Sequence, residues 1–327
     1  MKRVALYIFT FLLLLGCDIH EFPVDYDSRI SFLLNLDFDT VLPIHDELTY
    51  SKGKTVSTKA ASDDHVMRYT VKAYPEDTSK ENVDTVYTFV FTKSDSSVSE
   101  DGVWLKLDEG TYTFRVWADY VDAGSLKDKY YNTEDFSEIK LINNDPHIGS
   151  TDYRDAFIGS ANVTIASDKE NKVTIDMARP MGKYKFISTD LDIFLQTMSE
   201  KGMSTDLMDF TVVFEYNLFM PCAFNAHEDV TADSWTGVSF ESKMQINDQN
   251  ELELGHDYIF VNHRGTSLSI SVSVYDKNGD RVASTDALDV PIARNKLTVV
   301  KGDFLTSKST GGISISPDYD GDYNIEI

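Results

Sequence analysis

The chain has 327 residues, of which 42% are hydrophobic and 12% aromatic, and its 54 acidic against 30 basic residues give a formal net charge of −24. This length and composition exclude a minidomain held by disulfides or zinc and a disordered chain, so we expect a folded protein of about two domains. The negative charge repels phosphate backbones and argues against a nucleic-acid partner.

The first segment has the features of an export signal. Two basic residues precede an apolar run over residues 4–15, which as a helix would span only about 18 Å of a ~30 Å hydrocarbon core. A signal peptide over residues 1–16 is therefore favoured over a membrane-spanning helix. The following Leu-Leu-Gly-Cys sequence, ending at Cys17, resembles a bacterial lipobox, which predicts lipidation of Cys17 and a tether over residues 17–28. The alternative is an ordinary secretory signal with a chance cysteine.

The second cysteine stands alone once Cys17 carries lipid. No intramolecular disulfide can then form, even in an oxidising compartment. Cys222 follows Met-Pro in a stretch rich in aromatic residues. We expect it to be a small buried hydrophobe rather than a nucleophile.

The mature chain is dominated by alternation of apolar and polar residues, the pattern of a half-buried β-strand. In residues 267–275, Leu268, Ile270, Val272 and Val274 alternate with serines. The same alternation marks residues 67–73, 87–91, 112–118 and 173–177.

Turn residues separate these segments. Residues 108–110 (Asp-Glu-Gly) join a strand over 103–107 to one over 111–120, and Asn278-Gly279 predicts a hairpin with a type I′ turn leading into residues 281–283.

One segment favours a helix. Over residues 191–201 the apolar side chains fall on one stripe, Thr189 and Asp192 suggest a capping box, and Gly202 follows as a stop. The strand spacing favours antiparallel sandwiches. We therefore predict an all-β fold of two tandem Greek-key β-sandwich domains, residues 29–180 and 181–327, with one short helix in the second. The boundary is set at residue 180, where proline and glycine interrupt the pattern.

A long irregular stretch over residues 124–157 interrupts the first domain. It is rich in charge, tyrosine and asparagine. Loops of this length often carry function.

Catalytic and metal-binding motifs are weak. None of the seven histidines has the spacing of a zinc site, and His227-Glu228-Asp229 and His256-Asp257 are interpreted as ordinary surface or structural pairs. No nucleophile elbow or phosphate loop occurs, although paired carboxylates for a hydrolase remain open. We predict no catalytic residues, no metal and no cofactor; the acidic turns at 276–280 and 318–322 are only weak calcium candidates.

The aromatic residues allow a glycan-binding alternative, because an indole face can stack on a sugar ring. Trp104 and Trp117 fall within predicted strands, so we expect them in the core. Trp235 lies in a predicted loop. Together with Tyr130 and Tyr131 of the irregular stretch, it is the candidate ligand platform.

The C-terminus alternates over fifteen residues. Its non-charged face includes Ile313, Ile315, Tyr323, Ile325 and Ile327. Such a strand either closes its own sheet or adds to the edge of another subunit's sheet, so these residues are a candidate strand-exchange segment.

Four segments carry a family resemblance: the lipobox with the following Asp-Ile-His-Glu-Phe-Pro, residues 110–119, residues 179–190 and residues 320–327. They resemble a family of Bacteroidales lipoproteins of unassigned function, similar to fimbrillin-like proteins and minor-fimbria anchors. The resemblance implies transthyretin-like sandwiches, an outer-membrane lipid anchor that faces the cell exterior, and assembly by strand exchange. Only Cys17 carries over as a functional residue. Cleavage at Arg29 would detach the lipid, which favours an anchor over a shaft subunit.

The functional expectation follows from these features. We expect a non-enzymatic, lipid-anchored cell-surface protein, a fimbrial anchor or assembly or adhesion component. Its expected partners are outer-membrane lipid through Cys17 and fimbrial subunits by β-strand addition. The alternative is a glycan-binding surface lipoprotein, and a hydrolase ranks third.

Overall fold

The computed structural model describes residues 29–42, 44–49, 64–76, 86–142, 146–247 and 249–306. The predicted lipidation site Cys17, the tether over 17–28 and the acidic turn at 318–322 lie outside these residues. So does the whole C-terminal candidate segment, namely Ile313, Ile315, Tyr323, Ile325 and Ile327.

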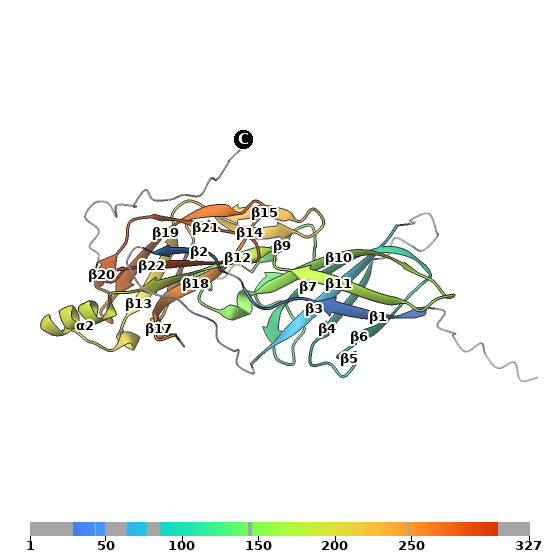
Figure 1. The fold of residues 1–327 in the computed structure, drawn as a ribbon, viewed down its shortest axis with the longest axis horizontal. Coiled ribbons are helices and arrows are strands. Elements are labelled where there is room, and N and C mark those ends of the chain that lie inside the picture. The colour runs from blue at the N-terminus through green and yellow to red at the C-terminus, as the bar shows by residue number, and fades with distance from the viewer. Residues whose placement is uncertain are drawn as a thin grey trace, which may run out of the picture.

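The molecule is elongated, with two β-rich assemblies placed end to end along its longest axis (Figure 1). Strands form nearly all of the regular structure, and α2 (Leu191–Glu200) is the one α-helix among the described residues. The all-β prediction with one short helix in the second half is confirmed.

The first assembly is one continuous path of eight strands in the order β4-β3-β7-β10-β11-β1-β6-β5. Their bounds are β1 (Ile30–Asp37), β3 (His65–Pro75), β4 (Tyr87–Thr92), β5 (Val98–Ser99), β6 (Gly102–Leu107), β7 (Gly110–Asp122), β10 (Ala156–Ile165) and β11 (Lys172–Ala178). Strands β10 and β11 share only two register pairs, so the path folds over there. Its inner faces enclose one core that includes Phe32, Val71, Phe114 and Ile175.

The alternation of β3 determines which side chains leave this core. Met67, Tyr69 and Val71 point into it. Arg68 and Thr70 therefore lie on the opposite face of the sheet, because successive strand residues point to opposite sides. This outer face of β3 carries the candidate site described below.

The second assembly contains three sheets. Their orders are β17-β18-β12-β22-β2, β16-β13-β19-β20 with β21 on β19, and β15-β14-β9-β8. The strands after residue 180 are β12 (Met181–Ser188), β13 (Thr211–Tyr216), β14 (Met220–Asn225), β15 (Val230–Trp235), β16 (Ser239–Ser242), β17 (Gln245–Ile246), β18 (Leu252–Phe260), β19 (Thr266–Tyr275), β20 (Arg281–Ser284), β21 (Leu288–Ile292) and β22 (Leu297–Gly302). The 3-10 helix η2 (Leu207–Asp209) follows α2. Aromatic side chains such as Tyr184, Phe186, Phe214 and Phe260 fill the core between the sheets.

Helix α2 covers this core with Phe194 and Met198, and Gly202 follows with a φ of +68°. The predicted capping box is wrong. The N-cap is Asp190, whose side chain makes no cap hydrogen bond and accepts instead from the backbone N–H of Leu305 and Thr306. Asp190 thus fastens the end of the described chain to the start of the helix.

The predicted hairpin between β19 and β20 is confirmed, but its turn type is wrong. A type I′ turn needs a positive φ at both central residues. Gly279 has a φ of +84°, but the φ of Asn278 is not positive, so the turn is not type I′. The Asp276 carboxylate accepts from the backbone N–H of Asn278 and of Asp280, each at 2.9 Å. The acidic residue therefore serves the turn itself.

Cys222 is completely buried in β14, as predicted. Burial raises the pKa of its thiol to about 12, so the thiol stays protonated at neutral pH.

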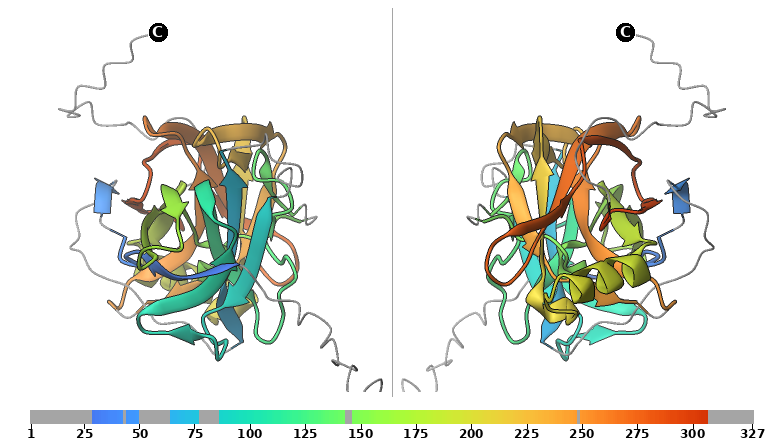
Figure 2. Two further views of the ribbon diagram at one scale, coloured as in Figure 1. Left: turned by 90° about the vertical axis from the view of Figure 1, so that its right-hand side faces the viewer. Right: turned by 90° about the vertical axis from the view of Figure 1, so that its left-hand side faces the viewer.

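Two segments from before residue 180 complete the second assembly. Strand β2 (Ile44–Thr49) pairs in parallel with β22 and lies at the periphery in the end-on views (Figure 2). Strands β8 (Tyr131–Asn132) and β9 (Ile139–Leu141) extend the sheet of β14. The predicted domain boundary at residue 180 falls between β11 and β12. Strands β2, β8 and β9 precede this boundary but belong to sheets of the second assembly.

Arg179 occupies the junction between the assemblies. Its side chain is only 1% exposed, and its Nε and Nη2 donate to the two carboxylate oxygens of Asp155 at 2.7 and 2.8 Å. Nη2 also donates to the backbone carbonyl of Thr40 at 2.7 Å, and Nη1 donates to Asn295 Oδ1 at 3.0 Å. One guanidinium thus joins the β1–β2 connection, the start of β10 and the segment before β22.

Replacing Arg179 by methionine tests this junction. Arg179→Met leaves the Asp155 carboxylate buried without its partner, so we expect a loss of about 3–5 kcal/mol in the free energy of unfolding. The measurement is urea unfolding at pH 7, with Lys172→Met as the control because Lys172 is exposed on the neighbouring strand. A loss below about 1 kcal/mol would show that the junction does not depend on this ion pair.

Candidate functional site

The irregular stretch over residues 124–157 does not extend away from the molecule as a free loop. Between its two ends it forms β8, β9 and the 3-10 helix η1 (Asp152–Arg154). Its first part, around Leu126 to Glu134, lies against the outer face of β3. This cover creates the candidate site.

A buried ionic cluster holds the cover in place. Arg68 Nε and Nη2 donate to the two carboxylate oxygens of Asp119 on β7 at 2.9 and 2.7 Å. Its Nη1 donates to Asp128 Oδ1 at 2.7 Å and to the backbone carbonyl of Leu126 at 2.9 Å. Thr133 closes the loop by donating from its backbone N–H and its hydroxyl to Asp128. The guanidinium is fully engaged by the protein's own acceptors.

The charges of this cluster are coupled. Burial raises the pKa of Asp119 to about 6, against the opposing effect of Arg68. Burial alone would lower the pKa of Arg68, but the Asp119 and Asp128 carboxylates raise it overall. Both members of the Arg68–Asp119 pair are therefore charged at neutral pH.

A pocket of about 430 Å³ lies between this cover and strands β3 and β4, within the size range of small-molecule sites. Its wall combines hydroxyl, charged and aliphatic side chains. The lining residues are Arg68, Thr70, Lys72, Thr88, Val90, Leu126, Asp128, Thr133 and Glu134.

Two side chains of the pocket wall, Lys72 and Thr70, differ in their hydrogen bonding. The Lys72 ammonium donates to the backbone carbonyl of Glu134 at 2.5 Å and lies 4.4 Å from the centre of the Phe136 ring. Burial lowers the pKa of Lys72. The Thr70 hydroxyl is buried, and none of the described residues makes a hydrogen bond with it. Because buried polar atoms are usually paired, Thr70 marks this pocket as unusual.

The predicted ligand platform is not assembled. Tyr131 is completely buried and its hydroxyl donates to the backbone carbonyl of Arg154, while Tyr130 is 7% exposed. Their rings belong to the core of the second assembly, so they present no free face to a ligand. Trp235 ends β15 rather than lying in a loop and is half-buried against the same core.

The expectation for the other two tryptophans is half right. Trp117 is fully buried, as predicted, but Trp104 is 60% exposed on β6. Val103 and Leu107 face the core of the first assembly, which places Trp104 on the outer face of β6 together with Lys106. Lys106 at the neighbouring outward position was the signal in the sequence that could have predicted this exposure.

The sequence did not predict a second buried ionic cluster, which is centred on Asp257. Asp257, interpreted as half of an ordinary His-Asp pair, is 1% exposed and accepts from the Tyr216 hydroxyl at 2.7 Å. Its carboxylate also contacts the Arg154 guanidinium and lies 3.0 Å from His147 Nε2. Because Arg154 and His147 lie more than a hundred residues earlier in the chain, no local motif could reveal this cluster.

Among the residues that the structure describes, no three His, Cys, Asp or Glu side chains converge as a metal site would require. No helix in those ranges is long and apolar enough to cross a membrane.

Fold and site together define an all-β protein of two joined assemblies with a polar pocket on the first. The chain belongs to a family of unknown function, DUF6562, whose model matches residues 31–327. Proteins with curated descriptions gave no match.

Three solved structures illustrate the wider structural similarity. A "putative cell adhesion protein" from Bacteroides eggerthii is 13% identical, with a TM-score of 0.45 and coverage of 87% of this chain and 90% of that one. A structure of "putative polysaccharide binding proteins" from Bacteroides thetaiotaomicron is 12% identical, with a TM-score of 0.44 and coverage of 80% of each chain. The fimbrial anchor protein Mfa2 from Porphyromonas gingivalis is 12% identical, with a TM-score of 0.40 and coverage of 79% of this chain and 82% of that one.

The cluster at Asp257 predicts how stability depends on pH. Burial alone would raise the pKa of Asp257, but Arg154 and His147 hold it well below its usual range. Burial, and then the charge of Arg154, lower the pKa of His147 below 6.5. For both groups the unfolded chain takes up its proton first as the pH falls, so acidification favours unfolding.

We therefore expect His147 to lower the free energy of unfolding as the pH drops below about 6.5 and Asp257 to lower it again below about 4, while Asp119, whose pKa is raised, offsets part of this loss. Urea midpoints between pH 7.5 and 3.5 measure this. His147→Gln should reduce the first decrease, whereas the control His263→Gln should not, because the side chain of His263 is 70% exposed. An unchanged pH profile in His147→Gln would contradict the assignment.

Proposed function

We propose that this protein is a non-enzymatic, lipid-anchored cell-surface protein that acts as a fimbrial anchor, assembly or adhesion component. The observation that carries the proposal is the lipobox-like sequence ending at Cys17, placed directly after a short apolar run. A covalent lipid at Cys17 would hold the chain at the outer membrane without a spanning helix, facing the cell exterior.

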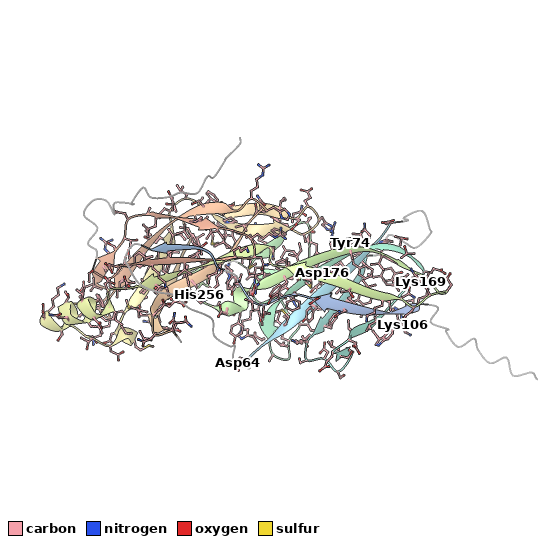
Figure 3. All side chains as sticks on the ribbon, in the orientation of Figure 1. Asp64, Tyr74, Lys106, Lys169, Asp176 and His256 are labelled. Carbon is pink, nitrogen blue, oxygen red and sulfur yellow. The ribbon has the colours of Figure 1, made fainter. Side chains whose placement is uncertain are left out.

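The position of the described N-terminal end supports this arrangement. Strand β1 starts at the end of the first assembly farthest from α2 (Figure 1). Lys106 and Lys169 lie at this same end (Figure 3). A tether over residues 17–28 would therefore place the first assembly nearest the membrane and direct the second assembly outward.

Strand addition is the mode of assembly that we propose for the fimbrial partners. Strand β4 is an edge of the first assembly, and β2 is an edge of the second. An edge strand presents unpaired N–H and carbonyl groups to an incoming strand. The alternating residues Ile313–Ile327 have the pattern of a strand that could be donated in return.

The two cysteines allow a matched test of the anchor. In cells labelled with a fatty-acid analogue, Cys17→Ala should lose the label and leave the outer-membrane fraction. Cys222→Ala, which removes the other cysteine from a buried position, should retain both. A fatty-acid label that persists in Cys17→Ala would refute lipidation at this residue.

A truncation tests assembly through the C-terminal segment. The full chain and a chain ending at Gly312 are captured from the native cell surface, and co-purifying proteins are compared by quantitative mass spectrometry. We expect fimbrillin-like subunits with the full chain and a loss of about tenfold with the truncated one. Equal recovery of those subunits from both chains would argue against strand exchange through this segment.

A glycan-binding surface lipoprotein is the second candidate. It is favoured by the polar pocket beside β3 and by the exposed indole of Trp104 on β6. This candidate shares the lipid anchor with the first but replaces a protein partner by a carbohydrate.

A further inference from the structure

We propose that the outer face of β11, β1 and β6 rests on the membrane that holds the lipid anchor, with the Trp104 indole in the head-group layer. This surface, called here the membrane face, consists of Ser31, Leu33, Trp104, Lys106 and Lys172. The inference rests on the proposed anchor at Cys17. It adds a second contact, made by the folded part of the chain, which sets the orientation of the molecule.

The strand register places the residues of the membrane face side by side. Leu33 of β1 pairs with Lys172 of β11 on one side and with Trp104 of β6 on the other. In the next outward position of β1, Ser31 pairs with Lys106. The residues that alternate with these along the strands pack into the core of the first assembly. Because successive strand residues point to opposite sides, the membrane face points to solvent.

The side chains of the membrane face have the chemistry of a membrane interface. Trp104 is 60% exposed, and Leu33 beside it is partly exposed. Tryptophan is enriched at membrane–water interfaces, because its ring contacts apolar groups while its N–H stays near water and head groups. Lys106 and Lys172 are exposed on the two flanking strands. Their long side chains can lie along an apolar surface while the ammonium groups contact lipid phosphates.

The length of the tether brings the membrane to this face. Lipidation at Cys17 would leave residues 17–28 between the acyl chains and the start of the described chain. A segment of that length spans at most about 40 Å, even when fully extended. Ile30 pairs with Leu107, which is about 10 Å from Trp104 along β6. The membrane face therefore stays within reach of the bilayer for as long as the anchor is in place.

The anchor also makes a small contact sufficient. One indole and two ammonium groups form too small a surface to hold a soluble protein on a membrane. For a chain that is already tethered, the same contact is intramolecular, and its effective concentration is in the millimolar range for a short linker. A weak contact is then occupied for much of the time.

Acidic residues on both sides of the membrane face limit the contact. Toward the junction, Asp37 pairs with Asp176, and residues 100–101 (Glu-Asp) precede β6. Asp176 lies on the junction side of this assembly (Figure 3). At the tether end, the exposed turns at residues 108–109 and 168–170 carry further acids. Lipid phosphates repel both groups, so the molecule neither stands on its tip nor lies flat. It tilts onto the membrane face, with the second assembly directed outward.

The test follows tryptophan fluorescence in lipid vesicles. The full-length lipidated chain is reconstituted in vesicles of phosphatidylcholine and phosphatidylglycerol, with or without bromine atoms on the acyl chains near the head groups. Bromine quenches an indole that enters the lipid layer, so we expect quenching in the wild type. Trp117 is fully buried and Trp235 packs against the core of the second assembly. Trp104→Phe should therefore abolish the quenching, and the matched control Trp235→Phe should retain it.

Charge reversal tests the two lysines. The double variant Lys106→Glu/Lys172→Glu should lower the quenching at least about fivefold, because both ammonium groups would become carboxylates facing lipid phosphates. Added salt should weaken the quenching of the wild type. The control Lys127→Glu/Lys201→Glu makes the same change of charge at exposed positions outside the membrane face and should leave the quenching unchanged. Equal urea midpoints of the two double variants would exclude unfolding as the cause.

Flotation of the vesicles separates failure of the membrane face from failure of the anchor. Protein that floats with the vesicles while Trp104 stays unquenched would keep the anchor and overturn the membrane face. Protein that does not float would refute the anchor, and the membrane face with it. Quenching that persists in Trp104→Phe, or that the lysine variant leaves unchanged, would also contradict the proposal.

Two other occupants of this face would be recognised if Trp104 is not quenched. A lipid-free Cys17→Ala chain that sediments as a dimer, and as a monomer after Trp104→Ser, would make the face a contact between copies of the chain. Binding to immobilised glycans that is lost in Trp104→Ser would assign the indole to a carbohydrate site. Either result would replace the membrane as the partner of β6.

Discussion

The buried ion pair between Arg179 and Asp155 is the constraint on which the arrangement of the two assemblies depends. A charged group at this depth is tolerated only when its hydrogen bonds are nearly all made. The acceptors of Arg179 come from the start of β10, from the β1–β2 connection and from the segment before β22. Those segments must therefore meet at one point, which fixes the first assembly against the second.

The stretch over residues 124–157 follows the same principle at both of its ends. Asp128 ties its beginning to Arg68 on β3, and Arg154 ties its end to Asp257 on β18. Between these points, β9 continues the sheet of β14. A segment that resembles a loop by composition thus joins the assemblies, and the pocket forms where its first part covers β3. The same segment that connects the two assemblies therefore also forms one wall of the pocket.

Local patterns in the sequence predict the local structure well. Alternation located the strands, the apolar stripe located α2, and Asn-Gly located the β19–β20 hairpin. Features that depend on distant partners were not predictable from one chain. Tyr131 is buried because β8 joins a sheet made by residues far along the chain, and Asp257 is buried because Arg154 and His147 reach it from another segment. The pocket belongs to this second kind, since its walls come from β3, β4 and the cover.

The two parallel pairings of the N-terminal strands bear on how quickly the chain can fold. Leu33 of β1 pairs with Lys172, and Glu47 of β2 pairs with Val299 near the end of the described chain. Folding rates fall as contacts join residues farther apart in sequence. During synthesis, β2 emerges more than two hundred residues before its partner, so its strand edge stays open until β22 has left the ribosome. Such a chain is expected to fold slowly and to expose aggregation-prone edges meanwhile, which makes a holding chaperone advantageous during its biogenesis.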